Sequence, residues 1–411
     1  MSSVLAIPNL KSILRRPPVV ISLLTIVALL AFFAVSHLVH RFREEQKALA
    51  RHLYAEGQTA METGKPARAV AYFRAALEYN RTDFQYQLNL ARALRDTGLT
   101  DEAKSYLMNL WESSPDDGTV NLALARLAVR ENSLAEAIHY YHNATYGLWE
   151  SDAETHRRNA QFELIDFLLR QNARPQALAE LITLAASLPP NPQLEIQVAQ
   201  RFASLGDYGR AFSEYEAAIH HDRQNAVAQA GAGEAAFQLR QYGTAEKYLS
   251  AAVRIDPQNE NAQELLKTAR LTIQIDPFIH RISSAERTRR IRLAFYRAGQ
   301  RLESCVNTET GPEANSEPSP QKAETQANNT VNQKGSHADN SSSDLASLHQ
   351  NWLAMKPHLS RRRTSIDSDE GDQMMDLVFQ IEQQIPTSCG APTDIDQALL
   401  LLSQNRDGVD Q

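Results

Sequence analysis

The sequence predicts an all-α fold in which pairs of helices repeat along the chain and stack on one another. Three observations predict this fold class. Alanine returns at intervals of 34 residues, a residue that tolerates left-handed backbone stands at one fixed place in almost every interval, and one long apolar run without charge lies near the N-terminus. A fixed period of this length is typical of stacked supersecondary units.

Six alanines, each the twentieth residue of its unit, set the phase of the repeat. The first three are 34 residues apart and so are the last three, with a step of 40 between the two sets: Ala69, Ala103, Ala137, Ala177, Ala211 and Ala245. The longer step predicts a six-residue insertion near residues 147–155. The six units begin and end as follows: 50–83, 84–117, 118–151, 158–191, 192–225 and 226–259.

Two further columns keep the same phase. The eighth position is small in every unit but the fourth: Gly57, Ala91, Ala125, Ile165, Ala199 and Gly233. The twenty-fourth position is large and apolar: Phe73, Leu107, Tyr141, Leu181, Tyr215 and Leu249. Small residues at the eighth and twentieth positions let two antiparallel helices approach closely. The large side chain then fills the space beside the crossing.

The fifteenth position predicts where the first helix of each unit ends. It is Gly or Asn in five of six units: Gly64, Gly98, Asn132, Asn172 and Gly206, with Arg240 as the exception. Helices commonly end at a residue in the left-handed region, where Gly is free and Asn is tolerated. Each unit is therefore expected to be a helix, a tight turn and a second helix.

These columns resemble the pattern of the tetratricopeptide-repeat (TPR) family over residues 50–259. The resemblance implies a helical solenoid that binds other proteins along a groove lined by the first helices. The resemblance also implies which positions of each unit line this groove. In units two and three these positions carry five polar residues: Asn89, Arg92, Arg95, Arg126 and Arg130.

Some TPR proteins hold chaperone C-termini in a carboxylate clamp. Asn89 and Arg126 match that pattern, but Tyr54 and Leu122 stand where lysines are expected, and Gln58 stands where asparagine is expected. A clamp is therefore not predicted. Two interpretations stay open: a groove that favours acidic peptide segments, and arginines that are only solvated.

The segment from Val19 to Val39 predicts a transmembrane helix after a short tail of residues 1–18. It carries no charge, and a bilayer core of about 30 Å needs about 20 helical residues. The alternative is a cleaved signal peptide, although the apolar core of a signal is usually shorter, about 7–15 residues. Basic residues flank the span on both sides in nearly equal number. The short N-terminal tail favours an inner-membrane protein with its body on the non-cytoplasmic, periplasmic side.

After the repeats the chain predicts three further parts. The solenoid of residues 40–275 ends in one amphipathic capping helix, and residues 276–306 form a basic capping helix whose arginines are either solvated or bind acidic protein or lipid head groups. Residues 307–343 have the composition of a disordered linker. Residues 344–411 form a small helical tail, with one apolar stripe around Trp352 and another from Met374 to Ile385.

Composition and motifs argue against several classes of function. The net charge of −7 gives no basic signal for nucleic acid, and no Walker loop, HExxH motif or nucleophile elbow occurs. We therefore expect no catalytic, cofactor-binding or metal-binding residues, and no cofactor. The glycines at Gly231 and Gly233 imitate a dinucleotide motif but fall inside a predicted helix, where small residues serve packing.

Cys305 and Cys389 are the only cysteines and are a candidate disulfide across the linker. Such a bond would require an oxidising compartment; the alternative is two unrelated apolar residues. For function, we expect a membrane-anchored scaffold or adaptor in envelope assembly or trafficking. Two alternatives are an accessory or regulatory subunit of a membrane enzyme complex with a self-inhibitory C-terminal tail, and an enzyme with its site in the C-terminal segment.

Overall fold

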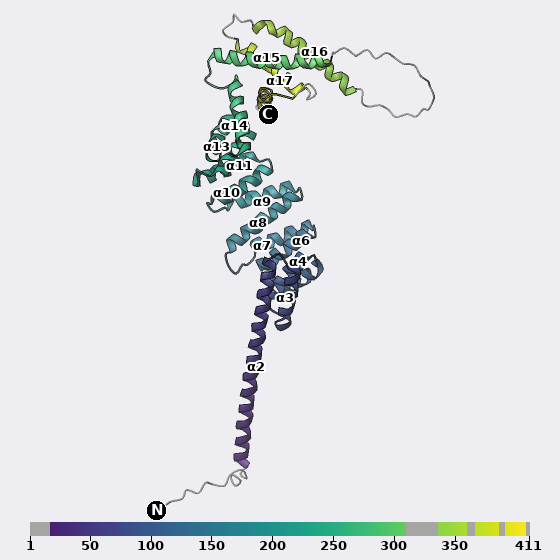
Figure 1. Ribbon diagram of the computed structural model, residues 1–411, viewed down its shortest axis with the longest axis vertical. Helices are drawn as coiled ribbons and strands as arrows, with labels where there is room; N and C mark the ends of the chain where they lie inside the picture. The colour runs from purple at the N-terminus through teal and green to yellow at the C-terminus, as the bar shows by residue number, and fades with distance from the viewer. Residues whose placement is uncertain (1–16, 310–335, 360–365, 386–390, 408–411) are drawn as a thin grey trace, which may run out of the picture. The chain divides into compact units, whose positions relative to one another are not determined.

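The structure, a computed structural model, describes residues 17–309, 336–359, 366–385 and 391–407. Its contacts divide the chain into two compact units, Met1–Leu184 and Ala185–Gln411. The described residues are helical almost throughout, and consecutive helices pair along the chain (Figure 1). The predicted all-α repeat fold is therefore confirmed.

The first unit contains the first four helix pairs. Each helix packs against the next one in the chain from α2 to α8. The helices are α2 (Pro17–Glu62), α3 (Pro66–Tyr79), α4 (Phe84–Thr97), α5 (Thr100–Ser113), α6 (Gly118–Arg130), α7 (Leu134–Tyr146), α8 (Ala153–Arg170) and α9 (Arg174–Ala186).

Helix α2 joins two elements that the sequence separates. The apolar run and the first helix of the first repeat form one uninterrupted helix of 46 residues (Figure 1). No proline or glycine falls between the two parts to break the hydrogen-bond ladder. The stretch from Ile21 is long and apolar enough to cross a membrane, a property that signal sequences share.

The repeat columns form the core as expected. All six alanines at the twentieth position are fully buried. The large residues at the twenty-fourth position are at most 5% exposed. The glycines at the eighth position lie directly against those residues. A Cβ atom on Gly57 would stand 2.4 Å from the Phe73 ring, and one on Gly233 would stand 2.6 Å from Leu249. Close helix crossing is therefore the reason for the small residues.

The turn at the fifteenth position is left-handed in all six units. The φ angle is +68° at Gly64, +86° at Gly98 and +80° at Gly206, and the two asparagines are also positive. Arg240, the exception by sequence, adopts φ +60° as well. The fold thus imposes the same turn on a residue that pays about 1–2 kcal/mol for left-handed backbone.

The start of each first helix shows a column that our sequence analysis missed. The last position of five units is Asp or Asn, and its side chain accepts a hydrogen bond from a backbone N–H of the helix that follows. These residues are Asp83, Asp117, Asn191, Asn225 and Asn259. N-caps of this kind stabilise a helix by about 1 kcal/mol each. The unit before the insertion has Ser151 there instead and lacks this cap.

The six-residue insertion mainly lengthens α8, which has 18 residues where α4, α6, α10 and α12 have 13 or 14. The rest of it extends the loop between α7 and α8, which is ordered. Leu148 exchanges backbone hydrogen bonds with Asp116 and Gly118, each at 2.7 Å. Trp149 stacks on His156 with ring centroids 4.6 Å apart. The Trp149 indole N–H donates to the Ala144 carbonyl at 2.9 Å. The insertion is thus fixed to the end of the preceding pair.

The second unit contains the last two helix pairs and a C-terminal group of helices (Figure 1). Its elements are α10 (Pro192–Ser204), α11 (Tyr208–His221), α12 (Ala226–Gln238), α13 (Tyr242–Ile255), α14 (Glu260–Ile275), α15 (Ser284–Glu309), α16 (Ser336–Met355), the 3₁₀ turn η1 (Lys356–Leu359), α17 (Ser368–Gln384) and α18 (Asp394–Asp407).

The C-terminal helices share one apolar core, which we call the C-terminal module (α15, α16, η1, α17 and α18). Trp352 is 1% exposed, stacks on Phe295 and donates its indole N–H to the Phe295 carbonyl at 3.0 Å. The predicted stripe from Met374 to Ile385 is buried in the same core. Helix α18 packs along α14, the helix that ends the repeats. The described part of the tail is therefore docked on the end of the repeats.

The predicted linker and disulfide fall partly outside the described residues. Residues 310–335 and Cys389 are not described. Helix α15 runs to Glu309 and α16 begins at Ser336, so both helices extend into the range 307–343. Cys305 is fully buried in the core of the C-terminal module. Its pairing with Cys389 stays a prediction.

Candidate partner-binding face

The first helices of successive pairs in the first unit lie next to one another. Helix α2 contacts α4, α4 contacts α6, and α6 contacts α8. We call the surface made by α4, α6, α8 and the part of α2 from residue 50 onward the first-helix face. Asn89, Arg92 and Arg95 lie on α4, and Arg126 and Arg130 lie on α6, so all five predicted residues belong to these helices.

Arg92 lies at the centre of these residues and has few partners. Its terminal nitrogen is 3.4 Å from the side-chain oxygen of Asn89, and its Nε atom is buried without a hydrogen-bond partner in the described part of the chain. Burial lowers the pKa of Arg92, and the neighbouring charges of Arg126 and Arg95 lower it further. The positive charge here is thus desolvated and incompletely balanced.

Asn89 links Arg92 to the first repeat. Its side-chain NH₂ donates to the Tyr54 hydroxyl at 2.6 Å and to the backbone carbonyl of Gln85 at 2.9 Å. Tyr54 in turn stacks on Tyr86 with centroids 4.8 Å apart. These contacts fix the amide so that its oxygen faces Arg92. The tyrosine at the place of the family's lysine therefore orients a polar side chain instead of supplying charge.

Arg126 differs from Arg92 because it has an internal partner. It forms two hydrogen bonds with the Glu163 carboxylate of α8, at 2.9 and 2.6 Å. The Tyr141 hydroxyl donates to the same carboxylate at 3.3 Å. The bonds to Glu163 raise the pKa of Arg126. The sequence analysis did not predict Glu163. It is the sixth residue of its unit, and its partner Arg126 is the ninth residue of the unit before.

The remaining two arginines lie at the rim of this group. Arg95 pairs with its neighbour Asp96 at 2.8 Å, and Arg130 at the end of α6 is exposed. Tyr54, Asn89, Arg92, Arg95 and Arg126 form one polar patch, with Arg92 as its least balanced cation. Arg130 lies on the same helix as Arg126. A carboxylate fits such a patch because the Arg92 guanidinium can donate to it, whereas both N–H groups of the Asn89 amide are already donated to Tyr54 and Gln85.

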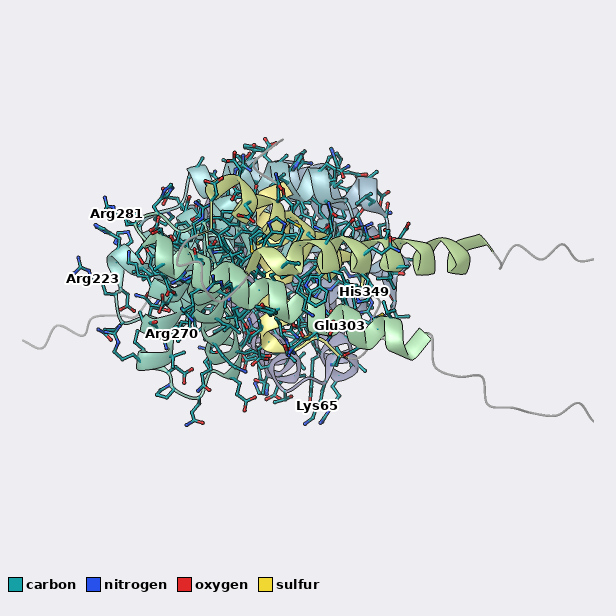
Figure 2. The ribbon with its side chains drawn as sticks, turned by 90° about the horizontal axis from the view of Figure 1, so that it is seen from above. Lys65, Arg223, Arg270, Arg281, Glu303 and His349 are labelled. Carbon is teal, nitrogen blue, oxygen red and sulfur yellow. The ribbon has the colours of Figure 1, made fainter. Side chains whose placement is uncertain are left out.

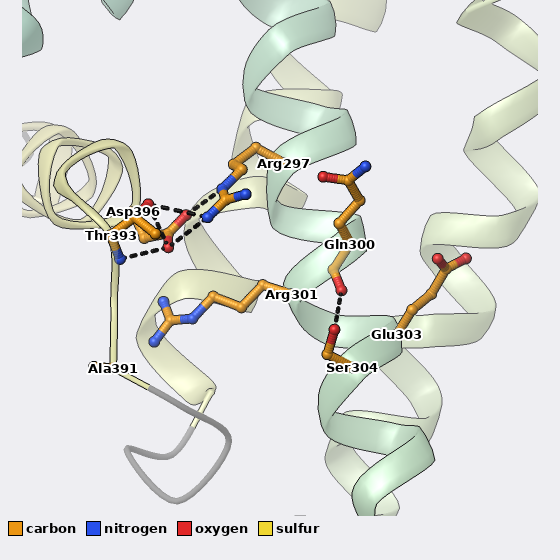
Figure 3. A pocket seen from close by; sticks show the side chains of 8 residues that line it. All are labelled: Arg297, Gln300, Arg301, Glu303, Ser304, Ala391, Thr393 and Asp396. Carbon is orange, nitrogen blue, oxygen red and sulfur yellow. Dashed lines mark hydrogen bonds and ion pairs between the residues drawn. The ribbon is translucent and has the colours of Figure 1, made fainter.

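A second group of arginines, on α15, is arranged differently. Helix α15 was expected to expose them, but acids of the C-terminal module pair with several: Arg287 with Asp372 at 2.9 Å, Arg297 with Asp396 at 3.0 Å, and Arg301 with the buried Glu382. Figure 3 shows Arg297, Asp396 and Thr393 bonded at the edge of a cavity of about 520 Å³. These cations hold the chain's own tail.

Histidines and other charged residues give no second candidate. His142 pairs with Glu180 at 2.9 Å and His221 with Glu195 at 3.4 Å, and no group of three metal-ligating side chains occurs within the described ranges. Arg223 and Arg281 project from the ribbon into solvent (Figure 2). Gly231 and Gly233 lie within α12 and pack against Tyr215 and Leu249.

Comparison with known proteins agrees with this fold. The model of the tetratricopeptide-repeat family matches residues 60–127 and 202–268, and none of the curated proteins matches the chain. With the six left-handed turns and buried columns described above, the match defines a helical repeat protein. The chain therefore carries tetratricopeptide repeats.

The chain is also similar to several solved structures. YrrB, described as a TPR protein with an unusual peptide-binding site, is 20% identical, with 47% of this chain and 97% of that chain covered and a TM-score of 0.37. Pseudomonas aeruginosa PilF is 17% identical, with 55% and 98% covered and a TM-score of 0.38. A TPR protein from Cytophaga hutchinsonii is 13% identical, with 58% and 93% covered and a TM-score of 0.43.

Proposed function

We propose that this protein is a membrane-anchored scaffold that binds acidic segments of partner proteins on the first-helix face. The observation that carries the proposal is Arg92, a partly buried arginine whose neighbours Arg95 and Arg126 are also cations. Its Nε atom has no hydrogen-bond partner among the residues that the structure describes. An unbalanced cation of this kind costs folding free energy. A partner's carboxylate would compensate that cost on binding.

Two substitutions test this binding. We expect Arg92→Gln to weaken the binding of fluorescein-labelled hexaglutamate by about tenfold or more, because it removes a charge-assisted hydrogen bond of about 1.5–3 kcal/mol. Arg68→Gln, which removes the same charge from an exposed position on the second helix α3, is the matched control. Fluorescence anisotropy would measure both affinities, with hexaglutamine as the neutral probe.

The melting temperature separates a binding role from a structural one. Because burial and two arginines lower the pKa of Arg92, we expect Arg92→Gln to melt at the same temperature as the wild type or higher. Binding should also weaken with salt, since a Debye length of about 8–10 Å screens the attraction at physiological ionic strength. Equal affinities for the two peptides, or equal effects of the two substitutions, would contradict the proposal.

The membrane part of the proposal rests on α2. Its apolar stretch is exposed along its whole length in the structure, and the helix continues without a break into the first repeat. Ten residues, 40–49, separate the end of the apolar run from the first repeat, or about 15 Å of helix at about 1.5 Å per residue. A rigid stalk of that length would hold the repeats just clear of the lipid head groups, on the non-cytoplasmic side.

Extraction tests the anchor. We expect the full-length protein to stay in the membrane fraction after an alkaline carbonate wash, because an apolar helix of this length is stable in lipid. A shortened chain that begins at Glu44 should be soluble and helical. Release of the full-length protein by carbonate would show that α2 is not an integral anchor, and an N-terminus that starts after Ser36 would show that it is a cleaved signal.

A further inference from the structure

Arg92 and Arg126 are equivalent residues of successive repeats with different surroundings. Each is the ninth residue of its unit. The partner of Arg126 is Glu163, the sixth residue of the next unit. The sixth residue of the unit that follows Arg92 is Ala123. Ala123 is buried and has no polar side chain, whereas Glu163 is bonded twice to Arg126. Within the described residues, the next repeat supplies Arg126 with a hydrogen-bonded carboxylate, whereas no carboxylate is hydrogen-bonded to Arg92.

We propose that Glu163 is a built-in competitor that occupies Arg126 in place of a ligand carboxylate. An acidic ligand then binds at Arg92 and reaches Arg126 only by displacing Glu163. This inference rests on the proposed function, and it assigns a specificity-determining residue to that face. Geometry supports it: the two Arg126 bonds at 2.9 and 2.6 Å are those that a bidentate ligand carboxylate would make.

The position of Glu163 permits displacement. Its side chain is 33% exposed and that of Arg126 is 38% exposed, so a ligand can approach both. Pairs with this exposure contribute little to stability, about 0–1 kcal/mol. The Tyr141 hydroxyl holds the carboxylate toward Arg126. Glu163 thus reduces the attraction of the face for acids in general and leaves Arg92 to select them.

The test measures the affinity of the chain that begins at Glu44, and of the full-length protein in detergent, for hexaglutamate. We expect Glu163→Gln to tighten binding by about fivefold or more and to steepen its salt dependence, because a further cation becomes available. The amide oxygen can still accept from Tyr141, so the fold should persist. Glu102→Gln is the matched control, because it removes the carboxylate of α5 that pairs with Arg74 of α3, away from the first-helix face. We expect it to change the affinity less than about twofold, because salt screens a remote charge.

Arg126 supplies the second arm. In the wild type, Arg126→Gln should weaken binding less than Arg92→Gln does, because Glu163 already neutralises Arg126 and the remaining loss comes only from repulsion by the freed Glu163 carboxylate. In a protein that already carries Glu163→Gln, Arg126→Gln should abolish the whole increase in affinity for hexaglutamate that Glu163→Gln produces. The double variant, with both charges removed, should bind like the wild type, and it remains informative where the single Glu163→Gln chain fails to fold.

The outcomes separate this inference from the proposed function. If hexaglutamate binds through Arg92 but Glu163→Gln behaves like Glu102→Gln, the competitor role is wrong and the binding face stands. If Arg126→Gln weakens the wild type as much as Arg92→Gln does, Glu163 does not shield Arg126. If neither the wild type nor Glu163→Gln prefers hexaglutamate to hexaglutamine, both proposals are wrong.

Discussion

Replacing Gly299 by alanine should unfold the C-terminal module at markedly lower denaturant than the wild type. A Cβ atom on Gly299 would stand 2.0 Å from the Trp352 ring. That ring is 1% exposed and stacked on Phe295, so it has no room to move. Overpacking of this kind costs about 1–3 kcal/mol, and the direct removal Trp352→Ala should cost about 3–5 kcal/mol.

Tryptophan fluorescence during denaturation would measure the loss in Gly299→Ala, and circular dichroism would measure it in Trp352→Ala, which lacks the reporter. Trp111 and Trp149 lie in the first unit and Trp352 in the C-terminal module, so replacing the first two by phenylalanine leaves a local reporter. Gly243→Ala in α13 is the matched control, because nothing lies within 4 Å of the added methyl group. We expect it to be neutral or slightly stabilising. Equal midpoints for Gly299→Ala and Gly243→Ala would show that the contact with Trp352 does not limit the packing.

The repeats were predictable because their contacts are local and periodic. A 34-residue spacing makes the same helix crossing recur, so a small residue at the eighth position and a large one at the twenty-fourth reveal it in the sequence. The terminal Asp or Asn column was equally readable: Asp83, Asp117 and Asn225 cap the helix that follows. The apolar columns do not reveal it, because these residues are polar and lie in the loops between units.

The C-terminal module was less predictable because its contacts join distant residues. Apolar stripes indicated which faces of α16 and α17 are buried, but not that Trp352 would meet Gly299, 53 positions earlier. The contacts of the α15 arginines were unpredictable for the same reason. Their acidic partners Asp372, Glu382 and Asp396 follow 81–99 positions later, and no periodicity connects them. Local pattern therefore finds the helices, while tertiary packing decides whether a charge is free.

The same limit applies to the first-helix face. The sequence placed Arg92 and Arg126 on one surface, and the repeat arithmetic was sufficient for that. Their different charge states depend on Ala123 and Glu163, single side chains in the following repeats. The family pattern does not specify which residue stands at these positions. The structure is needed to see which of the equivalent arginines has a partner.

The ion pair between Arg301 and Glu382 should make the C-terminal module sensitive to pH. The Glu382 side chain is fully buried and bonded to Arg301. Burial raises the pKa of Glu382 to about 7, and Arg301 acts in the opposite direction. Since the pKa is raised from its ordinary value of 4.5, the folded state binds the proton more tightly than the unfolded state. The stability from Glu382 is therefore full below about pH 4.5 and is lost as pH rises through about 7, by about 1–3 kcal/mol.

Removing Arg301 should enlarge this effect. We expect Arg301→Met to lower the free energy of unfolding of the C-terminal module by about 3–5 kcal/mol at pH 8, because it leaves a buried charge unpaired. At pH 5 the loss should be much smaller, since Glu382 can then fold in its protonated form. Chemical denaturation at both pH values would measure the difference, with Arg289→Met as a control at an exposed pair.

The double variant Arg301→Met, Glu382→Gln decides between a charge effect and a packing effect. Without the carboxylate no buried charge is left, so the pH dependence between about 4.5 and 7 should disappear. Most of the stability at pH 8 should also return, because a buried pair can often be replaced by uncharged groups at little cost. A double variant as unstable at pH 8 as Arg301→Met alone would show that the arginine stem fills space in the core and that its charge contributes little.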